Sequence, residues 1–202
     1  MRVQSILRVA ILVATGFLLS ACAPRETRPE GSWLADRTAL FEAYSAWSVS
    51  GRVGLSDGER GGSLSFTWEA DGDEHRVFLR TMTGGKQWRL VFDRAHAVLE
   101  GSDVGVIKGP GPDGLVEQAV GWPIPVAELV YWIRGLLPPH NAVDTEFAQD
   151  GTLAGAFSPP WVLEFQRYVN AQDVLLPARL EATSSSYRVR IVLRQWQLGV
   201  QP

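Results

Sequence analysis

Strict alternation of apolar and polar residues constrains the fold of this chain more than any other feature of its sequence. The alternation runs through residues 47–55 and 63–69, returns at 87–92, and recurs at 161–165 and 187–194. The apolar positions are Trp47, Val49, Val53, Leu55, Leu64, Phe66, Trp68, Trp88, Leu90, Phe92, Trp161, Leu163, Phe165, Val189, Ile191 and Leu193. A period of two is typical of an antiparallel strand with one dry face. These segments therefore predict a sheet whose apolar face is covered.

Helical patterns precede and interrupt the predicted strands. A helix is expected after Ser32, which suits an N-cap, because apolar residues recur at helical spacing over 33–47. Two more helices are predicted in the middle of the chain, one capped by Asp113 and one starting at Pro125. Further strands are expected at 75–81, 97–100, 104–108 and 180–182. Residues 33–202 thus predict one α+β domain in which a strongly curved antiparallel sheet wraps around helices.

The N-terminal segment indicates the compartment. Residues 1–21 have a basic start, an apolar run and small residues at the end, as in a secretory signal segment, and are too short to cross a bilayer comfortably. The run ends in Leu19-Ser20-Ala21-Cys22, which resembles a bacterial lipobox in which the Cys22 thiol receives diacylglycerol. A chance cysteine behind an ordinary signal segment is the alternative, although Cys22 is the only cysteine of the chain. Residues 22–32 predict a flexible tether, being rich in Pro, Arg, Glu and Gly.

Charge and motif content argue against several functions. The chain carries 19 Lys and Arg against 22 Asp and Glu without a basic cluster, so no nucleic-acid partner is expected. His75, His96 and His140 lack metal-ligand spacing and are interpreted as exposed loop and strand-end residues. There is no GxSxG elbow, and the GxGxxG match at 109–114 holds two prolines, which remove N–H donors that a pyrophosphate needs. We therefore expect no metal, no cofactor and no enzymatic activity.

A more specific signal lies between Gly121 and Pro138. The segment reads Gly121-Trp122-Pro123-Ile124-Pro125 and continues through Leu129, Trp132-Ile133, Gly135-Leu136 and Pro138. Together with the lipobox, the strands at 64–68 and 161–165 and a final strand reaching Trp196, it resembles the LolB family over nearly the whole chain beyond the signal segment. The resemblance implies an incomplete, open antiparallel β-barrel lidded by helices around a hydrophobic cavity. Ala23 follows the cysteine in place of the Asp that marks inner-membrane retention in lipoproteins, which implies the outer membrane, on its periplasmic side.

The resemblance also implies a function and partners. Such a protein accepts the acyl chains of lipoproteins from the periplasmic carrier LolA and inserts the lipoproteins into the outer membrane, where its own N-terminal lipid holds it; we expect a monomer. The residues expected to line the acyl-chain cavity are Val49, Val53, Leu64, Phe66, Trp68, Leu79, Leu90, Trp132, Leu163, Phe165, Val189 and Ile191. Plain core packing is the alternative for each of them, because cores and cavity walls share a composition.

The loop between the strands at 75–81 and 87–92 departs from the family. There the family projects an exposed leucine thought to aid membrane insertion of cargo, whereas the aligned position here is Thr83, and Met82 is the only large apolar side chain of the loop. Either Met82 takes the role or the role is weakened, and a plain hairpin turn whose Met82 packs back on the sheet is the alternative. A competing hypothesis for the whole chain is a lipid-anchored envelope protein with a solid core that binds another protein through its outer sheet face.

Overall fold

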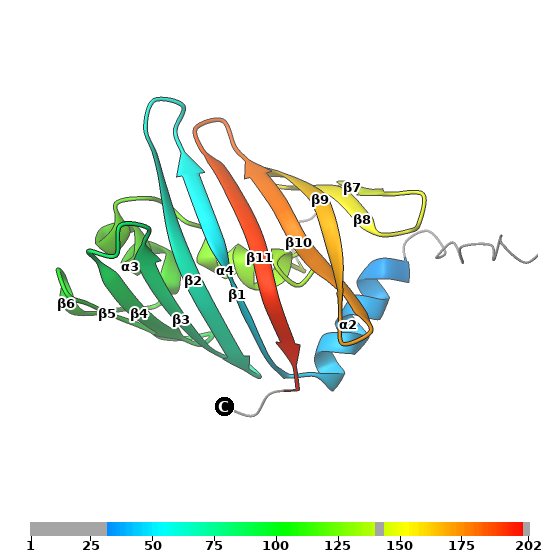
Figure 1. Cartoon of the computed structure of the whole chain (residues 1–202), viewed down its shortest axis with the longest axis horizontal. Helices are drawn as coiled ribbons and strands as arrows, with labels where there is room; N and C mark the ends of the chain where they lie inside the picture. Colours follow the sequence, from blue (N-terminus) through cyan, green and yellow to red (C-terminus); the bar gives the residue numbers. More distant parts are fainter. Residues whose placement is uncertain (1–31, 140–143, 200–202) are drawn as a thin grey trace, which may run out of the picture.

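One antiparallel sheet dominates the molecule (Figure 1). The computed structural model describes residues 32–139 and 144–199. Eleven strands lie in the order β6-β5-β4-β3-β2-β1-β11-β10-β9-β8-β7. Their bounds are β1 Ala46–Ser56, β2 Gly61–Asp71, β3 Glu74–Thr81, β4 Gln87–Phe92, β5 Ala97–Gly101, β6 Gly105–Gly109, β7 Asp144–Phe147, β8 Leu153–Ser158, β9 Trp161–Ala171, β10 Val174–Thr183 and β11 Arg188–Leu198. Over the described ranges β6 and β7 do not pair with each other, so the barrel is open, as predicted.

Strand β1 joins the two halves of the sheet, because it pairs with β2 on one side and with β11 on the other. The alternation predicted for residues 47–55 is confirmed, with every second residue facing the covered side of the sheet. Gly51 occupies one of these inward positions, directly opposite Phe66. A Cβ added to Gly51 would lie 2.7 Å from Cζ of Phe66. The glycine therefore leaves the space over β1 that the Phe66 ring fills.

Three helices contribute to the covering of the inner face. Helix α2 (Ser32–Ala43) precedes β1, whereas α3 (Pro112–Val120) and α4 (Val126–Trp132) follow β6 and lie behind the sheet in Figure 1. Trp33 fixes α2 in place, because it is fully buried and its indole N–H donates a hydrogen bond of 2.9 Å to the carbonyl oxygen of Gly135. No helix in the described part of the chain is long and apolar enough to cross a membrane.

The helix predictions need three corrections. The first helix ends at Ala43, and Trp47 belongs to β1. Asp113 does not cap α3, which starts at Pro112 without a side-chain cap; its carboxylate instead accepts the N–H of Ala127, 2.9 Å away in the first turn of α4. Pro125 immediately precedes α4 rather than opening it. Asp113 lies in the first turn of α3, and its side chain points toward the first turn of α4, where it accepts the N–H of Ala127.

Two strands were not predicted. The polar stretch before Trp161 contains β7 and β8, which pair with each other and extend the sheet beyond β9. Residues 140–143, with His140, lie outside the described residues, as do the predicted signal segment 1–21 and the tether apart from Ser32.

Candidate functional site

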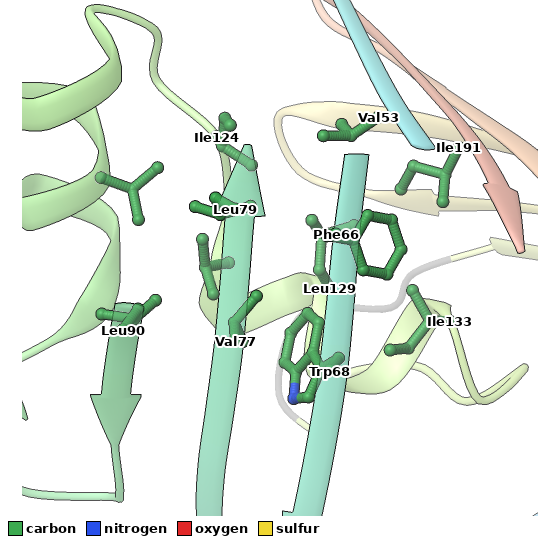
Figure 2. A pocket seen from close by; sticks show the side chains of 12 residues that line it. Val53, Phe66, Trp68, Val77, Leu79, Leu90, Ile124, Leu129, Ile133 and Ile191 are labelled. Carbon is green, nitrogen blue, oxygen red and sulfur yellow. The ribbon is translucent and has the colours of Figure 1, made fainter. Parts of the chain in front are cut away.

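A small apolar cavity lies between the inner face of the sheet and the helices α3 and α4 (Figure 2). Its volume is about 30 Å³. The sheet supplies Val53, Phe66, Trp68, Val77, Leu79, Leu90 and Ile191, and the helical side supplies Val116, Ile124, Val126, Leu129 and Ile133. Every lining residue is apolar, so the site has no group for acid–base, nucleophilic or metal chemistry. Such a lining suits the binding of hydrocarbon out of contact with water.

Half of the residues predicted for the acyl-chain cavity line this space. They are Val53, Phe66, Trp68, Leu79, Leu90 and Ile191. The other six, Val49, Leu64, Trp132, Leu163, Phe165 and Val189, are buried in the surrounding core but do not line it. For these six, participation in acyl binding stays a prediction, since only a larger form of the cavity would reach them.

Sequence reasoning missed the other half of the lining. Val77 lies in the alternating register of β3, between His75 and Leu79, so the period of two could have identified it. The remaining five come from α3, α4 and the turns beside them: Val116, Ile124, Val126, Leu129 and Ile133. Helical periodicity predicts which face of a helix is buried, but does not show which part of a sheet that face covers.

A second hollow of about 250 Å³ opens at the end of the sheet beyond the cavity. Leu64, Thr81 and Trp88 line it from the sheet, and Ala119 and Trp122 from the helical side. Cross-strand register places it one step along the strands from the cavity, because Leu64 lies opposite Thr81, and the next inward pair along the same two strands is Phe66 and Leu79. Its lining is mostly apolar but also includes Ser63, Thr81 and the cationic Lys86.

The loop between β3 and β4 extends from this same end of the sheet. Met82 at its tip is 46% exposed, so this side chain does not pack back on the sheet. Thr83 is also exposed. At the base of the loop, Lys86 Nζ lies 2.8 Å from a carboxylate oxygen of Asp103, whose other oxygen accepts the indole N–H of Trp88 at 2.9 Å. The hydrogen bond from Lys86 is the main cause that lowers the pKa of Asp103, and the ion pair fixes the base of a loop with an exposed apolar tip.

His75 is buried, which corrects the interpretation of this histidine as exposed; His96 is exposed as predicted. Nδ1 of His75 accepts the indole N–H of Trp68 at 3.1 Å, and its ring stacks on Phe92 at 4.8 Å between centroids. Burial, and then the nearby charge of Arg134, lower the pKa of His75 from 6.5 to about 4. The neutral imidazole therefore accepts a hydrogen bond that orients Trp68, a cavity residue.

The positive charge of Arg134, which adds to the lowering of the pKa of His75, lies among aromatic rings. Its guanidinium lies 5.2 Å from the ring of Phe41 and 5.6 Å from that of Tyr131, and its Nε donates to the carbonyl oxygen of Val130 at 2.6 Å. Burial lowers the pKa of Arg134. The cation–π contacts offset part of the cost of placing this charge among aromatic rings. Over residues 32–139 and 144–199, no group of three His, Cys, Asp or Glu could hold a metal ion.

Comparison with known proteins gives a consistent result. The sequence model of the family described as "Outer membrane lipoprotein LolB" matches residues 45–196. An outer-membrane lipoprotein LolB from Chromohalobacter salexigens is 30% identical over 94% of this chain and 88% of the relative. The LolB of Cellvibrio japonicus is 25% identical over 95% and 96%, and that of Xanthomonas euvesicatoria is 32% identical over 82% and 78%.

Solved structures support the fold at low sequence identity. A LolA superfamily protein from Nitrosomonas europaea has a TM-score of 0.54 at 8% identity, covering 85% of this chain and 94% of its own. A domain from Vibrio parahaemolyticus, described as an outer membrane lipoprotein-sorting protein, has a TM-score of 0.54 at 9% identity, covering 83% and 92%. Both confirm the open antiparallel sheet with helices. The chain therefore belongs to the LolB family, whose members are outer-membrane lipoproteins with a role in lipoprotein localisation.

Proposed function

We propose that this protein accepts the acyl chains of lipoproteins from a LolA-like periplasmic carrier and inserts the lipoproteins into the outer membrane. The single observation that supports this role best is the cavity between the sheet and α3 and α4, whose walls are entirely apolar. Its position in the fold agrees with the hydrophobic cavity that membership of the family implies. The proposal extends the family role in lipoprotein localisation to a particular site.

Energetics require such a site. Burial of hydrocarbon contributes about 0.8 kcal/mol per methylene, so releasing a chain of about sixteen carbons into water costs on the order of 12 kcal/mol. Cargo must therefore pass directly from one apolar cavity to another. Since the proposed transfer uses no nucleotide, it proceeds toward the site of higher affinity.

The cavity must enlarge to do this. Its volume of about 30 Å³ is similar to the roughly 30 Å³ that one water molecule occupies in the liquid, far too small for an acyl chain. We infer that α3 and α4 move away from the sheet when an acyl chain enters. Both helices are short, at nine and seven residues, and helices of this length depend on packing for stability. Their lining residues make only non-directional apolar contacts across the cavity, so separation breaks no hydrogen bond there.

The hollow beside Trp122 is the proposed entrance. It lies one inward residue pair beyond the cavity along β2 and β3, and Thr81 at the end of β3 leads directly into the loop of Met82. An acyl chain leaving through this hollow would emerge next to the exposed Met82 side chain. We propose that Met82, with the neighbouring Thr83, contacts the acyl region of the membrane in place of the leucine of the family.

Acyl binding is tested with an apolar fluorescent probe and the variant Leu129→Asn. Leu129 lines the cavity, whereas Leu176 is fully buried in β10 outside it, so Leu176→Asn is the matched control. Each variant buries an unpaired amide and loses roughly 1–3 kcal/mol of stability. We expect stoichiometric probe binding by the wild type, weaker binding by Leu129→Asn, and near wild-type binding by folded Leu176→Asn. A folded wild type that binds no probe would support the solid-core alternative.

Insertion is tested separately with Met82→Glu. A charge at the loop tip disfavours contact with hydrocarbon, so this variant should still take lipoprotein from the carrier but should deposit it in liposomes more slowly. Thr83→Glu places the same charge on the adjacent residue and measures how local the effect is. Normal deposition by Met82→Glu would exclude the loop from the mechanism.

The anchor proposal concerns Cys22. Cys22→Ala removes the thiol that would carry the lipid, and the tether contains no second membrane-binding element. We expect the variant to remain uncleaved or to lose its attachment to the outer membrane in cell fractionation. Normal outer-membrane fractionation of this variant would contradict lipidation at Cys22.

A further inference from the structure

The face of the sheet opposite the helices carries a groove much larger than the inner cavity. Its volume is about 970 Å³, and its lining residues come mainly from β11, β1, β2, β3 and β4. Its exposed residues Arg52 and Arg80 stand next to Val53 and Leu79, which face the inner cavity, so the groove lies on the side of the sheet away from the helices; Figure 1 shows α4 behind these strands. The proposed transfer of acyl chains makes no use of this face.

Strand register determines which side chains meet there. Arg52 in β1 lies opposite Ser65 in β2, which in turn lies opposite Arg80 in β3. In the neighbouring row, Arg194 in β11 lies opposite Ser50 in β1. Adjacent strands are about 4.8 Å apart, so the backbones of Arg52 and Arg80 are about 10 Å apart with a serine between them. Long cationic side chains thus project on both sides of a floor of short polar residues.

A β-bulge adds to this arrangement. The register of β1 with β11 shifts between Ser48 and Ser50, and Gln195 adopts a φ of +49°, which is unusual for a residue other than glycine. As a result two consecutive residues, Arg194 and Gln195, are both exposed to solvent. The Oγ of Ser50 donates a hydrogen bond of 2.7 Å to the side-chain oxygen of Gln195. Bulges commonly redirect side chains next to functional sites. Here the bulge places Arg194 and Gln195 together at the groove.

Three of the four arginines that line the groove are not neutralised within the described residues. Arg52, Arg80 and Arg194 form no ion pair there, whereas Arg188 and Arg190, farther along β11, both pair with Glu181. Of the remaining charged groups that line the groove, Arg89 and Glu100 pair with each other at 3.3 Å. Three unpaired positive charges therefore gather in one groove of a chain whose formal net charge is −3. This segregation indicates an anionic partner.

The shape of the groove favours an extended peptide. Five strands at about 4.8 Å spacing give a width of roughly 19 Å, which matches about six extended residues at about 3.3 Å each. Phe78, 46% exposed, lines the groove between Thr67 and Arg89 and offers an aromatic contact. A flat membrane surface fits a recess poorly. The tether of this chain fits it poorly too, because its two arginines cancel its two glutamates.

We propose that this groove binds an extended acidic segment, about six residues long, of a partner protein. Guanidinium groups suit this role because each can form paired hydrogen bonds with a carboxylate. The segment crosses the strands, so Arg194 contacts a carboxylate at its β11 end, and Arg52 in β1 and then Arg80 in β3 contact carboxylates farther along it. The proposal does not depend on acyl binding in the inner cavity.

The test measures binding of fluorescent hexaglutamate to the full chain in detergent by anisotropy at low salt. The triple variant Arg52→Glu, Arg80→Glu, Arg194→Glu should lose at least about tenfold in affinity. The matched control is Arg60→Glu, Arg94→Glu, Lys108→Glu, which changes the net charge equally at exposed positions that do not line the groove. This control should lose less than about threefold, an effect of net charge alone.

A milder triple variant with Gln at Arg52, Arg80 and Arg194 removes the charges without reversing them and should also weaken binding. Circular dichroism checks that every variant is folded. Absence of hexaglutamate binding by the wild type, or an equal loss in the groove and control triples, would overturn the proposal. Arginine-dependent binding to phosphatidylglycerol vesicles without binding to hexaglutamate would assign the groove to a membrane surface and would overturn it too.

Discussion

Two parts of the same inner face are packed in different ways. At one end of the sheet, the ring of Trp47 lies 6.1 Å from that of Trp68, 6.0 Å from that of His75 and 5.8 Å from that of Trp196. The indole N–H groups of Trp68 and Trp196 are both hydrogen-bonded, to His75 and to the carbonyl oxygen of Pro177. We call this the aromatic end. The cavity under α3 and α4 is instead lined mostly by aliphatic side chains and contains a void.

The difference separates a rigid region from a deformable one. Contacts between tilted rings and indole hydrogen bonds are directional, so they favour one arrangement of the aromatic end. Aliphatic side chains attract each other without a preferred direction, so the cavity can change shape at lower cost. Trp68 belongs to both regions, because it lines the cavity and is oriented by His75. We infer that the aromatic end keeps the sheet in place while the cavity opens.

The strongest test compares truncations in the two regions. Trp47→Ala removes the centre of the ring cluster and should cost about 3–5 kcal/mol of unfolding free energy. Leu129 borders an existing void and lies on a short helix that can move. Leu129→Ala should therefore lower the free energy of unfolding by about 2 kcal/mol, the lower limit for such a change. Urea denaturation measures both. Equal losses would show that the cavity region is as rigid as the aromatic end.

A pH titration probes the aromatic end through His75. Burial keeps the pKa of His75 at about 4 in the folded chain, against 6.5 when unfolded. The unfolded chain therefore binds a proton between these values and the folded chain does not. The contribution of His75 to the free energy of unfolding is fully present above about pH 6.5. It should fall by roughly 3 kcal/mol as the pH drops to about 4. The difference between wild type and His75→Phe isolates this contribution, and identical slopes for the two proteins would contradict it.

Two tryptophans allow a smaller comparison. Trp196 donates its N–H to the carbonyl oxygen of Pro177 at 3.0 Å, whereas the buried Nε1 of Trp132 in α4 has no hydrogen-bond partner within the described residues. Trp196→Phe leaves the carbonyl oxygen of Pro177 without this donor. We therefore expect Trp196→Phe to lower the free energy of unfolding by about 1–2 kcal/mol more than Trp132→Phe does. Thermal unfolding of the two variants measures the difference. A larger loss for Trp132→Phe would mean that its N–H has a partner such as an ordered water.

The sequence predicted the sheet better than the cavity, for a physical reason. Alternation over β1, β2, β4 and β11 is visible because each strand has one dry and one wet face. β7 carries Phe147 as its single large apolar residue, so no alternation marks it. His75 was misinterpreted because residue type was given more weight than register, although His75 alternates inward with Val77 and Leu79. The helical half of the cavity depends on how α3 and α4 sit against the sheet, which local patterns do not encode.

The contact that holds these two helices together gives the smallest predicted effect. Asp113 in α3 accepts the N–H of Ala127 in α4, and burial raises the pKa of this carboxyl, as it does that of Glu128 nearby. Asp113→Ala should lower the free energy of unfolding by about 1 kcal/mol, as the loss of a capping side chain does. Asp113→Asn keeps an acceptor oxygen without the charge, so its loss of stability should be smaller. If the helices open as a pair, the Ala variant should also admit the apolar probe faster. A probe on-rate that rises equally in Asp113→Ala and Asp113→Asn would show that the charge, and not the hydrogen bond, keeps α3 and α4 together.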